Sequence, residues 1–123
     1  MNKKIFLTSI SLVLASCSPD LATPDPYGTW FGTLQTDEGF CPTNAPSTLR
    51  IYGKEMVFAA ANGPLILHGK HLQKETHFIL SLTKEGMDGV PFHMLFNGWP
   101  DGATIKGVYA TPRCRAHITL RRW

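Results

Sequence analysis

The chain is poor in charged residues and in cysteine, and after its first residues it lacks long basic or apolar runs. Charged side chains make up 17% of the 123 residues, and there are three cysteines. Beyond residue 4, basic residues cluster only in Arg113-Cys114-Arg115 and Arg121-Arg122, which is too little to follow a nucleic acid backbone. No apolar run after residue 14 is long enough to cross a bilayer. These absences argue against nucleic acid as a partner and against a helical membrane protein.

Motifs of the common enzyme classes are also missing. The sequence has no Gly-x-Ser-x-Gly, His-Glu-x-x-His, Walker or Cys-x-x-Cys motif. Its carboxylates gather where turns are expected, and solvated acidic side chains are common at turns. We therefore predict a protein that is not an enzyme and that uses no cofactor. The carboxylates concerned are Asp37, Glu38, Glu55, Glu85, Asp88 and Asp101.

The N-terminal segment, by contrast, carries a specific pattern. Lys3 and Lys4 precede an apolar stretch, 5–14, that is too short to span a bilayer, and the stretch ends in Leu14-Ala15-Ser16-Cys17. This pattern resembles the signal of bacterial lipoproteins, in which the cysteine of the lipobox is acylated and becomes the new N-terminus. The resemblance implies a signal peptide at residues 1–16 and a lipid anchor on Cys17. The alternative is an ordinary cleaved signal followed by an unrelated cysteine.

Residues 17–26 read as a tether between the lipid and a folded domain at residues 27–123. The segment after Cys17 contains three prolines and two aspartates and has no apolar periodicity, which favours an extended spacer. In the best-known sorting rule of bacterial lipoproteins, an aspartate after the acylated cysteine retains the protein in the inner membrane. Ser18 occupies that position here, so the resemblance implies the outer membrane, with the domain facing the periplasm.

From Tyr27 onward the pattern is all-β. Apolar residues recur with a period of two, turn dipeptides separate the runs, and no helical repeat follows residue 17. About eight short strands in one domain predict a small antiparallel up-and-down β-barrel, or a closely related sandwich. The predicted strands lie near Tyr27–Gln35, Thr48–Tyr52, Met56–Ala61, Pro64–Gly69, Thr76–Thr83, Pro91–Asn97, Thr104–Ala110 and Arg115–Arg122.

The alternation also predicts which side chains point into the barrel. A two-residue turn at Asn62-Gly63 would place Phe58 opposite Leu67, and both belong to the inward set. A tight turn at Asp88-Gly89 would set Glu85 opposite Phe92, so we expect a longer connection there. The inward side chains are large, and we expect them to fill the barrel without a ligand-sized cavity. The inward set is Trp30, Leu34, Leu49, Ile51, Met56, Phe58, Leu65, Leu67, Phe78, Leu80, Leu82, Phe92, Met94, Phe96, Ile105, Tyr109, Ile118 and Leu120.

The first and last predicted strands carry a second resemblance. Gly28-Thr29-Trp30 is similar to the Gly-x-Trp signature of calycin-type barrels, the superfamily of the lipocalins and avidins. In those barrels a basic residue of the last strand lies over the tryptophan. Arg122 shares the inward phase of its strand, so antiparallel closure would bring it beside Trp30, where a cation–π contact can form. A core tryptophan after a turn glycine in an unrelated barrel is the other interpretation.

Closure of the last strand on the first would also bring the two remaining cysteines to the same end of the barrel. Cys41 follows the first strand and Cys114 precedes the last one, so both belong at the barrel end opposite Trp30 and Arg122. In the oxidising envelope we expect this pair to form a disulfide. Two free thiols are the minority interpretation.

The histidines suggest no firm metal site. His68, His77 and His93 fall in the outward phase of three consecutive strands, and they would meet only if the strand register allowed it. That register is not evident from the sequence, and no carboxylate is clearly placed to complete a site. We expect scattered, solvated histidines and no metal. His71 falls in a loop, and His117 lies on a distant strand.

A filled barrel leaves the loops to carry function. Asp88 lies in the long, glycine-rich segment 84–90, and Trp99 lies in the turn-like segment 97–102, so we take these two residues as candidates for binding a protein partner. The first hypothesis is a non-enzymatic, lipid-anchored envelope protein that binds a partner protein, with inhibition of a hydrolase as one form of it. The alternative is a calycin-like carrier of a small apolar ligand. Inhibitors of lysozyme are among the small envelope β-barrels that this chain resembles in size and anchor, but the sequence lacks their Ser-Gly-x-x-Tyr motif.

Overall fold

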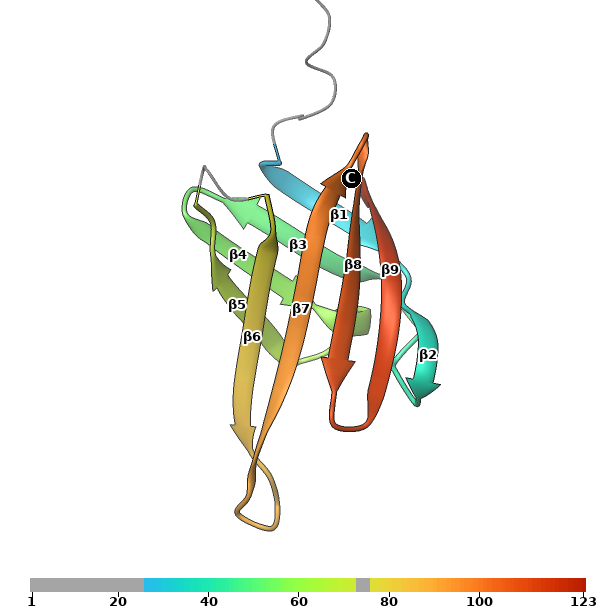
Figure 1. Cartoon of the computed structure of the whole chain (residues 1–123), viewed down its shortest axis with the longest axis vertical. Coiled ribbons are helices and arrows are strands. Elements are labelled where there is room, and N and C mark those ends of the chain that lie inside the picture. Colours follow the sequence, from blue (N-terminus) through green and yellow to red (C-terminus); the bar gives the residue numbers. More distant parts are fainter. Residues whose placement is uncertain (1–25, 73–75) are drawn as a thin grey trace, which may run out of the picture.

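The computed structural model describes residues 26–72 and 76–123, and almost all of its regular structure is β-strand (Figure 1). The signal segment, Cys17 and the tether up to Asp25 lie outside the described residues, so the lipid anchor stays a prediction. No helix in the described part is long and apolar enough to cross a membrane. The strands are β1 (Gly28–Gly32), β2 (Gln35–Gly39), β3 (Ser47–Tyr52), β4 (Glu55–Ala59), β5 (Ile66–Lys70), β6 (Phe78–Glu85), β7 (Pro91–Asp101), β8 (Thr104–Thr111) and β9 (Cys114–Arg122).

These strands form a closed antiparallel barrel. Within the described residues the sheet order is β1-β3-β4-β5-β6-β7-β8-β9-β2, and a further pairing joins β1 to β9. That pairing sets Trp30 opposite Arg122 and Phe31 opposite Arg121, and it leaves only β2 outside the ring. The predicted all-β fold and the eight-stranded up-and-down barrel are therefore confirmed, with one extra strand. The extra strand, β2, pairs with β9 alone.

The prediction of one continuous first strand, Tyr27–Gln35, is wrong. The chain forms two strands with a break at Thr33 and Leu34. At Gly32, β1 lies so close to β9 that an added Cβ would be 2.3 Å from the Thr119 carbonyl oxygen. Leu34, 1% exposed, then packs into the core, and in the described part of the chain β2 continues along β9 and does not pair with β3. The apolar alternation continues through this break between β1 and β2, so the sequence pattern alone does not reveal the break.

The predicted pairing of Phe58 with Leu67 is confirmed, although the turn that produces it differs. In place of a two-residue Asn62-Gly63 turn, Ala60–Asn62 forms a short 3-10 turn, with positive φ at Ala61 and Asn62. The Gly63 N–H donates to the Ala60 carbonyl oxygen at 2.9 Å. Any loop centred between residues 62 and 63 gives the same register, which is why the pairing was predictable and the turn was not.

The middle of the barrel is filled as the alternation predicts. The rings of Phe58 and Phe96 stack with centroids 4.3 Å apart, and Tyr109 lies 5.7 Å from Phe58. Gly98 and Gly107 leave room for the Phe96 ring, since a Cβ on Gly107 would lie 2.5 Å from it. Most of the inward set is fully buried. Three of its members, Leu65, Leu82 and Phe92, are only partly buried and pack against the core.

The predicted contact between Trp30 and Arg122 is present. The Arg122 guanidinium carbon lies 4.4 Å from the centroid of the Trp30 ring, and its Nη1 donates to the Tyr27 carbonyl oxygen. Gly28 has a φ of +120°, which disfavours a side chain, and a Cβ there would approach Arg122 Nη1 to 3.2 Å. The barrel is thus closed between its first and last strands by contacts among Gly28, Trp30 and Arg122.

The up-and-down topology gives the barrel two different ends. At the N-terminal end lie the start of β1, the β3–β4 and β7–β8 turns and the end of β9 (Figure 1). At the opposite end, which we call the loop end, lie the β6–β7 loop, the β8–β9 turn and the connection that follows β2. The hairpin of β6 and β7 extends beyond the other strands at the loop end.

Candidate functional site

A pocket of about 1270 Å³ lies at the loop end of the barrel and is lined mainly by apolar side chains. Its floor includes Leu65, Phe92, Met94 and Tyr109, which all belong to the inward set. The expectation that large inward side chains leave no ligand-sized cavity is therefore wrong at this end. The physical reason is unequal strand length. The pairing of β6 with β7 continues to Glu85 and Pro91, whereas β8 pairs with β7 only as far as Leu95, so the end of the β6–β7 hairpin extends beyond the neighbouring strand and its inward side chains are only partly covered.

The rim of the pocket exposes large apolar side chains to solvent. Met87, in the β6–β7 loop, is fully exposed, and Val90 in the same loop is 60% exposed. Phe40, which follows β2, is 93% exposed and also lines the pocket. Exposed apolar side chains gathered around a pocket are typical of a surface that buries them against a ligand or partner.

The β6–β7 loop has a defined shape. Glu85 pairs with Pro91, so the connection is Gly86–Val90, longer than a tight turn as expected, though shorter than 84–90. Gly86 N–H donates to the Val90 carbonyl oxygen at 3.0 Å, and the Asp88 carboxylate accepts the Val90 N–H at 3.0 Å. Asp88 therefore lies on the rim, as a candidate binding residue should, while its carboxylate also shapes the loop.

The opposite wall of the pocket is fixed by a disulfide. The predicted bond between Cys41 and Cys114 is present, with Cα atoms 5.3 Å apart. Cys114 lines the pocket and begins β9, so the bond holds the segment that contains Phe40 against the barrel. The Thr111 hydroxyl accepts the N–H groups of Arg113 and Cys114, which closes the β8–β9 turn beside it.

The floor of the pocket is apolar, and the charged side chains of its lining lie on the rim. Burial raises the pKa of the Tyr109 hydroxyl, so this group is neutral at physiological pH. The charged residues of the lining, Lys84, Glu85, Asp88 and Arg113, are all exposed. An apolar floor with charges on its rim suits the binding of an apolar group inside a polar border.

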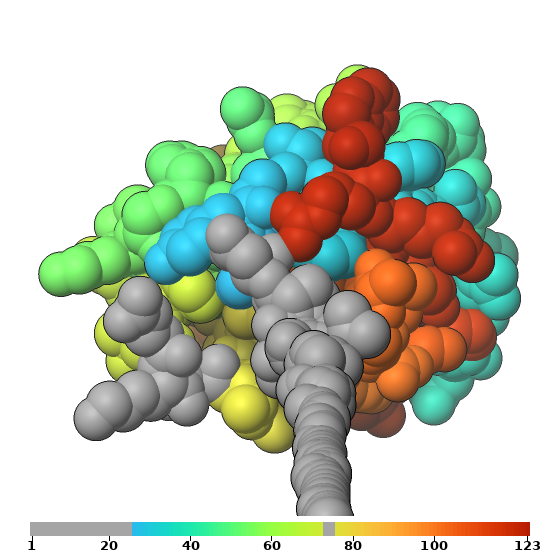
Figure 2. All heavy atoms as spheres, turned by 90° about the horizontal axis from the view of Figure 1, so that it is seen from above, coloured from blue at the N-terminus to red at the C-terminus, as the bar shows by residue number. Residues whose placement is uncertain are grey.

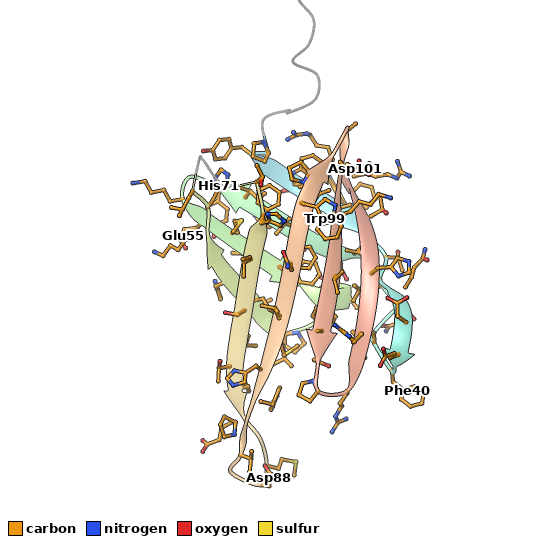
Figure 3. All side chains as sticks on the ribbon, in the orientation of Figure 1. Phe40, Glu55, His71, Asp88, Trp99 and Asp101 are labelled. Atoms are coloured by element: carbon orange, nitrogen blue, oxygen red, sulfur yellow. A yellow bond between two sulfur atoms is a disulfide. The ribbon has the colours of Figure 1, made fainter. Side chains whose placement is uncertain are left out.

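The structure separates the two predicted binding residues. Asp88 lies at the loop end and Trp99 lies near the N-terminal end (Figure 3). Trp99 belongs to β7, opposite Lys106, and is not part of a turn as the segment 97–102 suggested. The run of β7 from Pro91 to Trp99 alone separates the two ends by about 26 Å, at the rise of an extended strand. The two residues therefore belong to different ends of the barrel.

The histidines do not gather into a metal site. In the residues that the structure describes, no group of three or more His, Cys, Asp or Glu side chains could hold a metal ion. His68 faces Ser81, whereas His93 faces Thr83 and contacts its hydroxyl at 2.9 Å, so His68, His77 and His93 do not converge. His117 lies 2.9 Å from the Asp37 carboxylate.

His71 differs from the solvated loop residue that the sequence suggests. It is 7% exposed, and its ring meets Tyr27 edge-on, with centroids 5.2 Å apart, at the N-terminal end.

The sequence reasoning missed Phe40, Met87 and Val90, the exposed residues of the rim. The available signal was their position, because each is a large apolar residue in a predicted connection, outside the inward phase of any strand. No protein-family model matches this chain, and no curated protein or solved structure matches it either. Function must therefore be argued from the barrel's own surface.

Proposed function

We propose that this protein is a non-enzymatic, lipid-anchored binding protein of the bacterial envelope that receives part of a protein partner in its loop-end pocket. The observation that carries the proposal is the open apolar pocket with Phe40, Met87 and Val90 exposed around it. Burying one such side chain completely against a partner stabilises a complex by about 1.5–3 kcal/mol. Three of them around one depression can form the centre of an interface.

The shape of the pocket favours a protein segment as the first candidate ligand. The pocket is open on one side, and its rim is built by the β6–β7 loop and by the segment that holds Phe40. An apolar side chain of a partner can enter the depression while the partner's backbone rests on the rim. The domain size, single disulfide and predicted anchor are similar to those of small envelope inhibitors of hydrolases, so an envelope hydrolase is the partner class we favour.

A small apolar ligand is the second candidate, and the pocket volume is the observation that favours it. Ligand sites usually measure about 300–1,000 Å³, and this pocket of about 1270 Å³ could contain an acyl chain or a ring system. The contact between Trp30 and Arg122 also fits the resemblance to calycin-type barrels, several of which carry apolar ligands.

The lipobox supports the envelope location and the anchor. Leu14-Ala15-Ser16-Cys17 would place the lipid before the tether, and the described chain enters the barrel at the N-terminal end. The pocket lies at the other end, so a tethered barrel can present it away from the membrane. We propose the outer membrane, with the barrel facing the periplasm.

Site-specific photocrosslinking in cells distinguishes these candidates. The full-length protein would carry benzoyl-phenylalanine at Met87, and a matched protein would carry it at Trp99 on the other end. We expect the Met87 probe to capture one defined envelope protein, identified by mass spectrometry, and the Trp99 probe to capture none. Val90→Asp, which places a charge on the rim, should abolish the crosslink and leave the circular dichroism spectrum unchanged.

Other outcomes have definite meanings. A protein captured from Trp99 alone would move the binding surface to the N-terminal end and refute the pocket proposal. If no protein is captured, and 1-anilinonaphthalene-8-sulfonate binds the purified protein with an affinity lowered tenfold or more by Val90→Asp, the small-ligand candidate replaces the first. If neither occurs, the pocket has no binding role.

A further inference from the structure

We propose that the N-terminal end of the barrel docks on an anionic phospholipid surface, so that the domain stands on the membrane with its pocket pointing away. The inference rests on the proposed lipid anchor and goes beyond it, because an anchor alone leaves the orientation of the barrel undetermined. Three features carry the inference: the charge of this end, an exposed tryptophan on it, and the short predicted tether that precedes Tyr27.

The charges of the two ends differ in sign. Counting side chains of the described residues, the N-terminal end holds five cations against two carboxylates, whereas the loop end holds three cations against four carboxylates. Both carboxylates of the N-terminal end pair with cations of the same end, Glu55 with Lys70 at 3.4 Å and Asp101 with Lys106 at 3.9 Å, so this end keeps an excess of three positive side chains. The N-terminal cations are Lys54, Lys70, Lys106, Arg121 and Arg122. The loop-end charges are Lys84, Arg113, Arg115, Asp37, Glu38, Glu85 and Asp88.

Trp123 provides an apolar group beside these cations. It is 80% exposed, and its ring meets Phe31 edge-on, with centroids 5.2 Å apart. The backbone N–H of Trp123 donates to the Thr29 carbonyl oxygen at 2.8 Å, which ties this residue to β1. Tryptophan prefers the headgroup region of a bilayer, where its ring is partly buried and its N–H stays hydrated. A fixed, exposed tryptophan next to Arg121 therefore suits a lipid surface.

The tether makes this end the one that meets the membrane. Figure 2 looks onto this end and shows β1 and the C-terminal residues side by side on it. Residues 17–26 can span at most about 35 Å when fully extended, at about 3.5 Å per residue. An acylated Cys17 therefore keeps the barrel close to the bilayer, and the face nearest the attachment point is the positively charged one. Each cation near an anionic leaflet strengthens attachment about fivefold.

The test uses the full lipid-anchored protein, purified from membranes and reconstituted into vesicles of phosphatidylcholine alone or with phosphatidylglycerol. Lipids brominated on the acyl chain quench tryptophan fluorescence at close range. We expect quenching to increase when phosphatidylglycerol is present, and Trp123→Phe should reduce that increase, with any remainder due to Trp99 at the same end. Arg121→Gln should lower the equilibrium constant for docking about fivefold. The matched control, Arg113→Gln at the loop end, should leave it unchanged.

The failures of the two proposals are distinguishable. Mass spectrometry of the N-terminal peptide reports whether Cys17 carries acyl chains. If it does, and quenching is the same in both vesicle types and in the Arg121→Gln variant, docking is refuted while the anchor stands. Equal losses from Arg121→Gln and Arg113→Gln would also refute it, because attraction would then depend on total charge and not on this end. An unacylated Cys17 removes the anchor and, with it, the docked orientation.

Discussion

Removing the disulfide should destabilise the barrel strongly. Cys41 and Cys114 are separated by 73 residues, so their bond closes a loop that spans most of the domain. In the chain-entropy model, a loop of this length restricts the unfolded chain by about 4 kcal/mol at 25 °C. Small domains have a total stability of about 5–15 kcal/mol, so the bond contributes a large share. We expect the double variant Cys41→Ala/Cys114→Ala to lose about 3–4 kcal/mol, which corresponds to a fall in Tm of roughly 12–30 °C.

Urea denaturation followed by tryptophan fluorescence measures this loss. Trp30 is 2% exposed and reports the opening of the barrel. The variant should also show a steeper dependence of the unfolding free energy on urea, because an uncrosslinked unfolded chain exposes more surface. Reduced wild-type protein is the matched control, since it keeps both sulfur atoms and loses only the bond. A loss below 1 kcal/mol in both proteins, with an unchanged urea dependence, would refute the argument from loop closure.

Three further predictions address the core, the pocket floor and the anchor. Gly107→Ala should destabilise the barrel by about 1–3 kcal/mol in urea denaturation, because the new Cβ would lie 2.5 Å from the Phe96 ring, and Phe96→Leu should relieve part of that cost. Burial raises the pKa of Tyr109 above its ordinary 10.0, so its contribution to stability should be complete below pH 10 and be lost as the pH rises through the higher folded-state pKa. Tyr109→Phe should remove that alkaline component of a Tm-against-pH profile, and an identical profile would contradict the assignment. Cys17→Ser should abolish incorporation of radiolabelled palmitate, and undiminished labelling would refute the lipoprotein prediction.

The inward side chains were predictable because a strand alternates strictly between two faces. Phe58, Leu67 and Phe96 were assigned from period two alone, and all three are buried. The contact of Trp30 with Arg122 was implied by the resemblance to calycin-type barrels, together with the inward phase of Arg122 and closure of the last strand on the first. The pairing of Cys41 with Cys114 followed from the ends at which an up-and-down barrel places them. Apart from that resemblance, these inferences need only local alternation and the direction of each strand.

The candidate site was less predictable, because it depends on where strands end. Trp99 was assigned to a turn-like segment at 97–102, yet β7 runs to Asp101 and includes Trp99 as a strand residue. Proline and glycine around Trp99 signal a turn, but cross-strand hydrogen bonds to β8 keep this segment extended. Pairing between distant segments thus outweighed the local preference.

The sequence by itself determined the class of fold, the inward face of each strand and the cysteine pair, and it contains the complete pattern from which the anchor is predicted. These properties follow from residues close together in the chain, or from their order along it. Only the tertiary structure decided that β1 separates from β2 at Gly32, that His71 is buried and that the loop end opens into a pocket. Those features arise from unequal strand lengths and from contacts between segments far apart in sequence, which no local pattern records.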